Sequence, residues 1–347
     1  LSELEDATSK LDASKTKYPS ADIAYGGDID KWKKLGYSMM LRLGMRLSKI
    51  DPAASETWVK KAYAGGVMTS VDDNLYISGS DKTGSQIELT NGDSRTLAVT
   101  TRSPGKISKT YFDFLKNHHD PRLKYTVAVY TDPTNVNTKN TDPAVQKGLP
   151  NGLDRITLGS DPSYNPNAAG QEHQYSGINR DIYAKLDGPR MFLTYAETQL
   201  LLAEAAVRGW ISGNPEELYI KGVKGAMKNL QKYDATALIS DAEMDQYLTA
   251  NPFVGIGDKE KAFEQINTQY WAATFLNGYE SFANVRRSGY PKLVPVNYPD
   301  NETGGVFPRR LRYPDDEAVL NADHYNAAVG RQGADNFKTR VWWDTEK

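Results

Sequence analysis

The fold is constrained most strongly by residues 190–208, where apolar side chains recur at the helical spacing of three to four residues. One apolar stripe would consist of Phe192, Ala196, Leu200, Ala203 and Val207. Gly209 follows as a stop, and Asn214 with Pro215 can begin a second helix, because Asn is a favoured N-cap and Pro suits the first helical position. The sequence therefore predicts a hairpin of two antiparallel helices here.

The second helix of this hairpin supplies a facing stripe of larger side chains: Tyr219, Val223, Met227 and Leu230. The small residues Ala203, Ala205 and Ala206 on the first helix would let the two helices approach closely. A unit of about 40 residues with small side chains facing bulky ones is typical of tetratricopeptide-type hairpins.

Two other parts of the chain have the same helical character. In residues 30–49, Trp32, Leu35, Met39, Leu43 and Leu47 recur at helical spacing, with Asp30 as the expected N-cap. A following helix is expected to be capped by Ser55 and to end at residues 65–66, and a further helix at 259–276 has Asp258 as its cap. We expect a mainly α protein, with a helical-hairpin scaffold at about 28–66 and 190–277.

The regions between these helices read as loops. Residues 69–91 have no helical period and are predicted to form an exposed loop. A short helix (108–116) and a brief strand (125–130) follow. After them comes a long segment, 131–188, that is rich in Pro, Asn, Gly, Thr and Asp. Loops of this length in compact domains are functional or disordered. We expect a loop-rich ligand-side region at about 120–189.

Composition excludes several classes of function. The chain has no cysteine, which removes disulfides, thiolate metal sites and cysteine nucleophiles. Its formal charge of −2 gives no basic surface for nucleic acid, which we do not expect as a partner. It has no apolar run long enough to span a membrane, and because it begins without Met we expect that an N-terminal portion with any targeting signal has been removed.

An enzyme is the main rival interpretation. A glycoside hydrolase needs two carboxylates across a sugar cleft, and Glu197 and Glu204 could share a helix face. Both lie among alanines and leucines, where structural pairing is expected, and the four histidines form no known catalytic motif. Residues 132–142 lack the Gly and Glu of a calcium loop. We therefore expect no catalytic residue, no metal and no cofactor.

Several short motifs, in order, carry a resemblance to a known family. They are GYESF at 278–282, VRRSGYPKL at 285–293, FPRRLRYP at 307–314, VWWD at 341–344, and upstream YGGD at 25–28 and YAE at 195–197. Together they resemble the blocks of the SusD/RagB family, in its SusD-like branch, from about residue 20 to the end. We expect Arg286, Arg287, Arg309 and Arg310 to tie irregular segments together, and residues 342–343 to be a packing anchor.

The resemblance implies one SusD-like domain over 1–347, truncated at its N-terminus, with the family's C-terminal signature region at 278–347. It implies a surface subunit of a Bacteroidetes-type outer membrane, anchored by an N-terminal lipid that this chain lacks. Such a subunit captures oligosaccharide without chemistry and delivers it to a SusC-like TonB-dependent transporter.

The ligand site implied by the resemblance falls in the long loop. We expect Tyr164, Tyr175 and Tyr183 to stack on sugar faces, and Asn179 and Arg180 to bind sugar hydroxyls. A peptide-capturing RagB-like subunit remains an alternative, since tyrosines and polar clamps suit both ligands. A helical-repeat scaffold that binds another protein is a further alternative, although its connections would be shorter.

Overall fold

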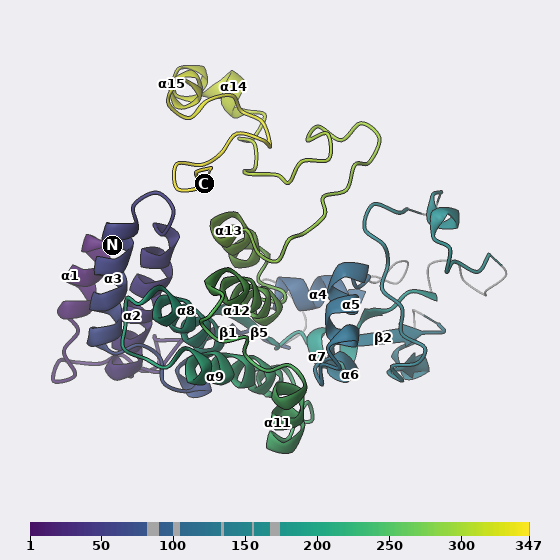
Figure 1. Ribbon diagram of the computed structural model, residues 1–347, viewed down its shortest axis with the longest axis horizontal. Coiled ribbons are helices and arrows are strands. Elements are labelled where there is room, and N and C mark those ends of the chain that lie inside the picture. Colours follow the sequence, from purple (N-terminus) through teal and green to yellow (C-terminus); the bar gives the residue numbers. More distant parts are fainter. Residues whose placement is uncertain (82–89, 100–104, 133–134, 155, 167–173, 347) are drawn as a thin grey trace.

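The computed structural model describes residues 1–81, 90–99, 105–132, 135–154, 156–166 and 174–346 (Figure 1). Its helices are α1 (Ser2–Ser9), α2 (Ile29–Arg46), α3 (Pro52–Gly65), α4 (Gly92–Val99), α5 (Lys109–Asn117), α6 (Leu123–Thr126), α7 (Arg180–Tyr183), α8 (Tyr195–Arg208), α9 (Pro215–Lys228), α10 (Leu230–Tyr233), α11 (Asp241–Ala250), α12 (Lys259–Ala273), α13 (Gly278–Ser288), α14 (Glu317–Leu320) and α15 (Ala322–Gln332). The predicted mainly α class is confirmed.

Short strands join the helices. Strand β1 (Leu75–Ser78) pairs antiparallel with β5 (Pro189–Leu193), and β2 (Val127–Tyr130) lies between β3 (Lys139–Asn140) and β4 (Gly177–Ile178). In Figure 1 the helices α1 to α3 lie together at one end, α8, α9, α12 and α13 form the centre, and the elements around β2 lie at the other end. Parts of the two predicted loop regions, at 82–89, 133–134, 155 and 167–173, lie outside the described residues. No helix in the described part of the chain is long and apolar enough to cross a membrane.

The N-terminal hairpin forms as predicted, but its caps are different residues. Asp28, not Asp30, accepts the first backbone N–H groups of α2, and Asp51, not Ser55, caps α3 just before a proline at its first position. The Ser55 hydroxyl instead donates to the carbonyl of Gly44 at 2.8 Å and ties α3 to α2. In both helices the cap is the residue directly before the first helical residue, where a carboxylate can accept from the free N–H groups of the first turn.

The buried face of α2 is also shifted from the predicted stripe. Met40, Leu41 and Met45 are fully buried, whereas Leu43 is 39% exposed. Since α2 packs against α1, α3 and α8, its neighbours determine which face is covered. Periodicity found the helix but not the orientation of its buried side.

Helix α8 begins five residues later than predicted. The Thr194 side chain accepts from the backbone N–H of Glu197, and Glu197 accepts in return from the backbone N–H of Thr194. This reciprocal capping fixes the helix start and leaves residues 189–193 extended, where they pair with β1. Phe192 is therefore a strand residue and is 42% exposed, not a member of the α8 stripe.

Among the described elements, α8 and α9 share the most extensive contact. The predicted α9 stripe of Tyr219, Val223, Met227 and Leu230 is buried, and the Asn214 cap is confirmed. A Cβ at Gly222 would lie 2.6 Å from Leu200 Cγ, so this glycine, as well as the predicted alanines, permits the approach. The predicted Asp258 cap of α12 is also confirmed.

The C-terminal region leaves the helical body after α13, and α14 and α15 lie away from it in Figure 1. Its arginines tie segments together as predicted: Arg287 pairs with Glu204, Arg309 with Asp344, and Arg310 with Asp335 at 3.2 Å. Arg286 donates to the carbonyl of Arg309 at 2.8 Å.

The predicted tryptophan anchor at 342–343 is only half right. Trp343 packs against Arg46 and Arg286, whose guanidinium centres lie 5.2 and 4.8 Å from its ring. Trp342 is 70% exposed. Adjacent side chains point in different directions in an irregular segment, so only one of them reaches the helical body.

Candidate functional site

A cleft of about 570 Å³ lies between strand β5 and the N-terminal turn of α13, and we call it the β5–α13 cleft. Its wall on one side comes from Arg190, Met191 and Phe192 of β5, and on the other from Asn277 and Tyr279. Asp93 of α4, Leu311 of the C-terminal segment, Arg42 and Glu280 also line it.

Local structure places the side chains of this cleft. The pleat of β5 puts Arg190 and Phe192 on the same, exposed face of the strand. Asn277 is the N-cap of α13, where its side-chain oxygen accepts from the backbone N–H of Glu280. Tyr279, in the first turn of that helix, is therefore held at the surface, and it is 79% exposed.

The cleft presents flat apolar faces next to charged groups that are exposed to solvent. Tyr279 and Phe192 are exposed aromatic rings. The Nε atom of Arg190 lies 4.0 Å from an Asp93 carboxylate oxygen, and both side chains are about half exposed. A sugar ring offers an apolar C–H face ringed by hydroxyls, so aromatic faces beside a guanidinium and a carboxylate match its chemistry.

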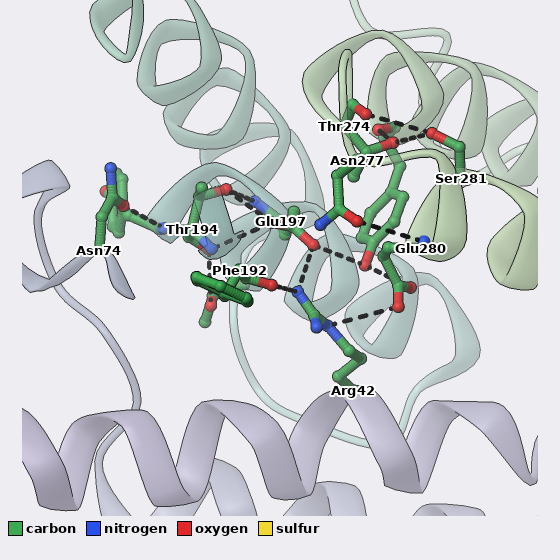
Figure 2. A network of polar contacts seen from close by, with 12 residues as sticks. Arg42, Asn74, Phe192, Thr194, Glu197, Thr274, Asn277, Glu280 and Ser281 are labelled. Atoms are coloured by element: carbon green, nitrogen blue, oxygen red, sulfur yellow. Dashed lines mark hydrogen bonds and ion pairs between the residues drawn. The ribbon is translucent and has the colours of Figure 1, made fainter. Parts of the chain in front are cut away.

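A buried network of polar contacts, shown in Figure 2, includes Arg42 and Glu280 of the cleft lining. Arg42 of α2 donates to the Phe192 carbonyl at 2.9 Å and forms an ion pair with Glu197 of α8. Glu280 of α13 accepts two hydrogen bonds from Arg46 at 2.8 and 2.9 Å. Arg42 thus fixes the backbone of β5 at the point where Phe192 projects.

Tyr270 of α12 joins the two carboxylates of this network. Its hydroxyl lies 3.1 Å from Glu197 and 2.9 Å from Glu280. Burial and the neighbouring Glu280 charge raise the pKa of Glu197, although Arg42 opposes them. Burial also disfavours the charged form of Glu280, but Arg46 and Arg42 outweigh it and lower the pKa of Glu280. The two carboxylates therefore have different environments although they share one partner.

The two carboxylates considered as catalytic residues of a hydrolase have structural roles. Glu197 and Glu204 are each 1% exposed, and each forms an ion pair with an arginine of another element. A general acid or nucleophile must reach the scissile bond. These two side chains do not reach any open surface.

The structure buries two of the predicted stacking residues. Tyr183 is 3% exposed, and its ring packs against Tyr233 and Phe275 at centroid distances of 4.9 and 5.5 Å. Tyr175 is 1% exposed, its hydroxyl donates to Asp161 at 2.7 Å, and Lys147 lies over its ring. Neither ring has a face open to a ligand, so their positions do not support the predicted stacking role.

Asn179 and Arg180, which are predicted to bind sugar hydroxyls, are also buried. Each has side-chain atoms without a hydrogen-bond partner among the described residues. Asn179 precedes α7, and its side-chain oxygen has no hydrogen-bond partner among the described residues. The Arg180 guanidinium lies 4.1 Å from the Tyr130 ring centroid, and its Nε and Nη2 atoms have no such partner in the part of the chain that the structure describes. Tyr164 is partly exposed and lies three residues before the undescribed residues 167–173. Its role as a ligand contact stays a prediction.

Sequence reasoning missed the residues of the β5–α13 cleft. Tyr279 stands within the GYESF motif at 278–282, which points to the family but not to a binding role, and the apolar period places Phe192 in the stripe of a helix. The Thr194 to Glu197 capping-box pattern was visible in the sequence and would have moved Phe192 out of the helix. Nothing in the sequence pairs Arg190 with Asp93, which lies almost 100 residues away.

Residues 1–314 match the model of a family described as "Starch-binding associating with outer membrane". A search of curated proteins finds no match.

Solved structures with the same fold are similar over almost the whole chain. A chitin-binding protein is 34% identical, with a TM-score of 0.81 over 99% of this chain and 71% of that one. A SusD-like protein described as Bacteroidetes AC2a is 27% identical, with a TM-score of 0.86 over 99% and 75% of the two chains. A chitin-binding SusD homologue from Flavobacterium johnsoniae is 26% identical, with a TM-score of 0.75 over 100% and 71%.

Proposed function

This chain belongs to the SusD-like family, and on that premise we propose that it is a non-catalytic glycan-capture subunit at the outer membrane. It binds oligosaccharide at the cell surface and delivers it to a SusC-like TonB-dependent transporter. The full-length protein is held at the membrane by a lipidated N-terminus. The family description as starch-binding and the two chitin-binding relatives support a glycan over a peptide as ligand.

The observation that carries the proposal is the composition of the β5–α13 cleft. Tyr279 and Phe192 offer rings for the apolar face of a sugar, while Arg190 and Asp93 can donate to and accept from its hydroxyls. The Arg190–Asp93 contact is loose and exposed, so replacing it by bonds to a ligand has a small free-energy cost. A capture protein needs such a surface because it must bind and then release its ligand unchanged.

The rigid support of the cleft fits binding without chemistry. The network of Arg42, Glu197, Glu280 and Tyr270 holds β5 and α13 relative to each other. A preorganised site loses less conformational entropy when the ligand binds. The predicted Tyr164 region is a second candidate contact for a long glycan.

Isothermal titration calorimetry tests the proposal. The protein is titrated with oligosaccharides from starch, cellulose and chitin, and with peptides from a protein digest. Saturable heat with a glycan, with the glycan recovered at its original length, is the expected result. Heat with peptides alone would move the ligand to the peptide-capturing alternative, and shortening of the glycan would contradict the non-catalytic role.

A further inference from the structure

A second cleft, of about 640 Å³, lies beside strand β1, and we call it the β1 cleft. Its lining includes residues of the loop at 16–27, Trp32 of α2, and Leu75 and Ile77 of β1. Phe192 of β5 lines the β1 cleft and also the β5–α13 cleft. Since Phe192 is 42% exposed, the two clefts meet at a side chain that solvent reaches.

The outer face of the ribbon formed by β1 and β5 runs from one cleft to the other. Ile77 of β1 lies opposite Arg190 of β5 in the antiparallel register, and residues directly opposite each other point to the same face. Phe192 is on that face too, because it is two positions from Arg190 on β5. Arg190 is about half exposed and Ile77 is partly exposed. A chain molecule on this face can therefore contact both clefts without entering the core.

The loop at 16–27 is organised around one carboxylate. Asp22 accepts hydrogen bonds from the backbone N–H groups of Ala24, Tyr25 and Gly27, with N–O distances of 3.0, 3.1 and 2.7 Å. The Trp32 Nε1 atom donates to the same carboxylate at 2.8 Å. These four hydrogen bonds tie the loop to α2, so the side chains that the loop exposes are held in position.

This loop holds large apolar side chains at the surface. Tyr18 is 72% exposed and Ile23 is 77% exposed, and both line the β1 cleft together with Phe192. Apolar side chains that gather in one exposed cleft indicate a binding surface, whereas single exposed ones are ordinary. The charged residues of the lining are Lys17 and Asp22, and the Asp22 carboxylate is already bonded within the loop.

We propose that the β1 cleft extends the glycan site, so that one linear oligosaccharide lies in both clefts and crosses the Phe192 ring; the inference rests on the proposed capture function. Because the clefts share one ring and one ribbon face, the same ligand is favoured over a separate partner. Arg190 and Asp93 give the β5–α13 cleft charged partners for hydroxyls, whereas the mostly apolar β1 cleft suits the C–H faces of sugar rings. The first cleft therefore orients the chain, and the second adds affinity for longer chains.

The first test measures how affinity depends on ligand length. Calorimetry on the unmodified protein uses α-1,4 glucose oligomers and β-1,4 N-acetylglucosamine oligomers, each from the trimer to the heptamer. In the series that binds, we expect the heptamer to bind at least about tenfold more tightly than the trimer, because linked contacts multiply affinity. A smaller rise would overturn the inference and leave the capture function standing. Absence of binding to every oligomer would overturn the capture function as well.

The second test places the gain in affinity at the β1 cleft. We expect Tyr18→Ala and Ile23→Asp each to lower the affinity for the heptamer roughly two- to tenfold, and to lower that for the trimer less, because each removes apolar contact from this cleft. Tyr63→Ala and Ile256→Asp are the matched controls, since both residues are exposed and line neither cleft. Thermal melting confirms that each variant is folded. Unchanged heptamer affinity in both folded cleft variants would overturn the inference.

A second copy of the chain is the other occupant that an exposed apolar cleft could take. Analytical ultracentrifugation without glycan tests it, and we expect the unmodified protein to sediment as a monomer. A dimer that Ile23→Asp dissociates and Ile256→Asp leaves intact would assign the β1 cleft to that contact and overturn the inference.

Discussion

Arg287 and Glu204 form a bidentate ion pair in the core, with Nη1–Oε1 and Nη2–Oε2 distances of 2.8 and 2.7 Å. Both side chains are at most 2% exposed. The pair joins α13 to α8, and Arg287 also donates to Asn267 and Asn284. The second arginine of the RR motif therefore fastens the C-terminal signature to the helical scaffold.

We expect Arg287→Met to lower the free energy of unfolding by about 3–5 kcal/mol, because it leaves a buried carboxylate with one partner fewer. Urea unfolding followed by circular dichroism measures the change. The matched control is Arg312→Met, since Arg312 is 41% exposed and its carboxylate partners are 3.8 and 3.9 Å away. A loss of more than about 1 kcal/mol in the control would contradict the distinction between buried and exposed pairs.

The same pair predicts how stability depends on pH. Burial disfavours the charged form of Glu204, but Arg287 and Arg208 outweigh it and hold the pKa of Glu204 well below its usual range. Its contribution is therefore complete above the unfolded-state pKa, near 4.5, and is lost as the pH falls below that value. We expect Glu204→Gln to give a shallower loss of stability between about pH 5 and 3 than the unmodified protein, as measured by urea unfolding.

The pKa of Glu197 is shifted in the opposite direction to that of Glu204, so Glu197 serves as the comparison. Burial raises its pKa, so the folded state binds more protons than the unfolded state and gains stability as the pH falls. Glu197→Gln should make the loss of stability in acid steeper. If the free energy of unfolding falls equally steeply with decreasing pH in the two variants, the opposite directions assigned to the two pKa shifts are wrong.

Tyr298 and Asp154 join the C-terminal segment to the loop-rich region. The Tyr298 hydroxyl donates to Asp154 at 2.6 Å, and this bond, with those from Thr157 and Ile156, lowers the pKa of Asp154 to about 2. We expect Tyr298→Phe to raise that pKa toward 3.8, as measured by NMR titration of the carboxyl group. Hydrogen exchange near residues 291–308 should become faster. An unchanged pKa would mean that Tyr298 does not make this contact in solution.

Two glycines test the close approach of the helices. A Cβ at Gly222 would meet Leu200, whereas a Cβ at Gly330 in α15 would meet nothing within 4 Å. We expect Gly222→Ala to destabilise the protein by about 1–3 kcal/mol through overpacking. Gly330→Ala should be neutral or stabilising by up to about 1 kcal/mol, because alanine favours the helix. Thermal unfolding compares the two, and equal effects would exclude packing as the cause.

The exposed rings of the cleft should carry a measurable part of the glycan affinity. We expect Tyr279→Ala and Phe192→Ala each to weaken binding by about 0.5–1.5 kcal/mol, or roughly two- to twelvefold. Tyr63→Ala, which removes a partly exposed ring from α3, is the control. If the two cleft variants bind like the control in calorimetry, the ligand lies elsewhere on the protein.

The helices that the sequence predicted could be located because their signals are local, whereas α1, α4, α11, α13 and α15 were not predicted. The Asn214 and Asp258 caps act on N–H groups two or three residues away, and apolar periodicity reports a helix wherever it lies. One error occurred where two local signals competed. Thr194 capped α8 and left residues 189–193 extended, which removed Phe192 from the helix.

The candidate site depended on contacts that no local pattern contains. Arg42 and Glu197 are separated by 155 positions, and Asp93 and Arg190 by almost 100. Tyr183 is buried against Tyr233 and Phe275, whereas Tyr175 is buried within the loop-rich region itself, beside Lys147 and Asp161. Composition alone therefore suggested exposed rings where the structure has buried ones.

The sequence by itself determined the helical class, the hairpins and the family, because caps, periodicity and motif order act over a few residues. Only the tertiary structure decided which face of α2 is buried, which charges are paired and where aromatic rings remain open beside exposed charged groups. Those outcomes depend on which elements meet in space, and the free energy of burying a side chain is set by its neighbours in the fold and not by its neighbours in the chain.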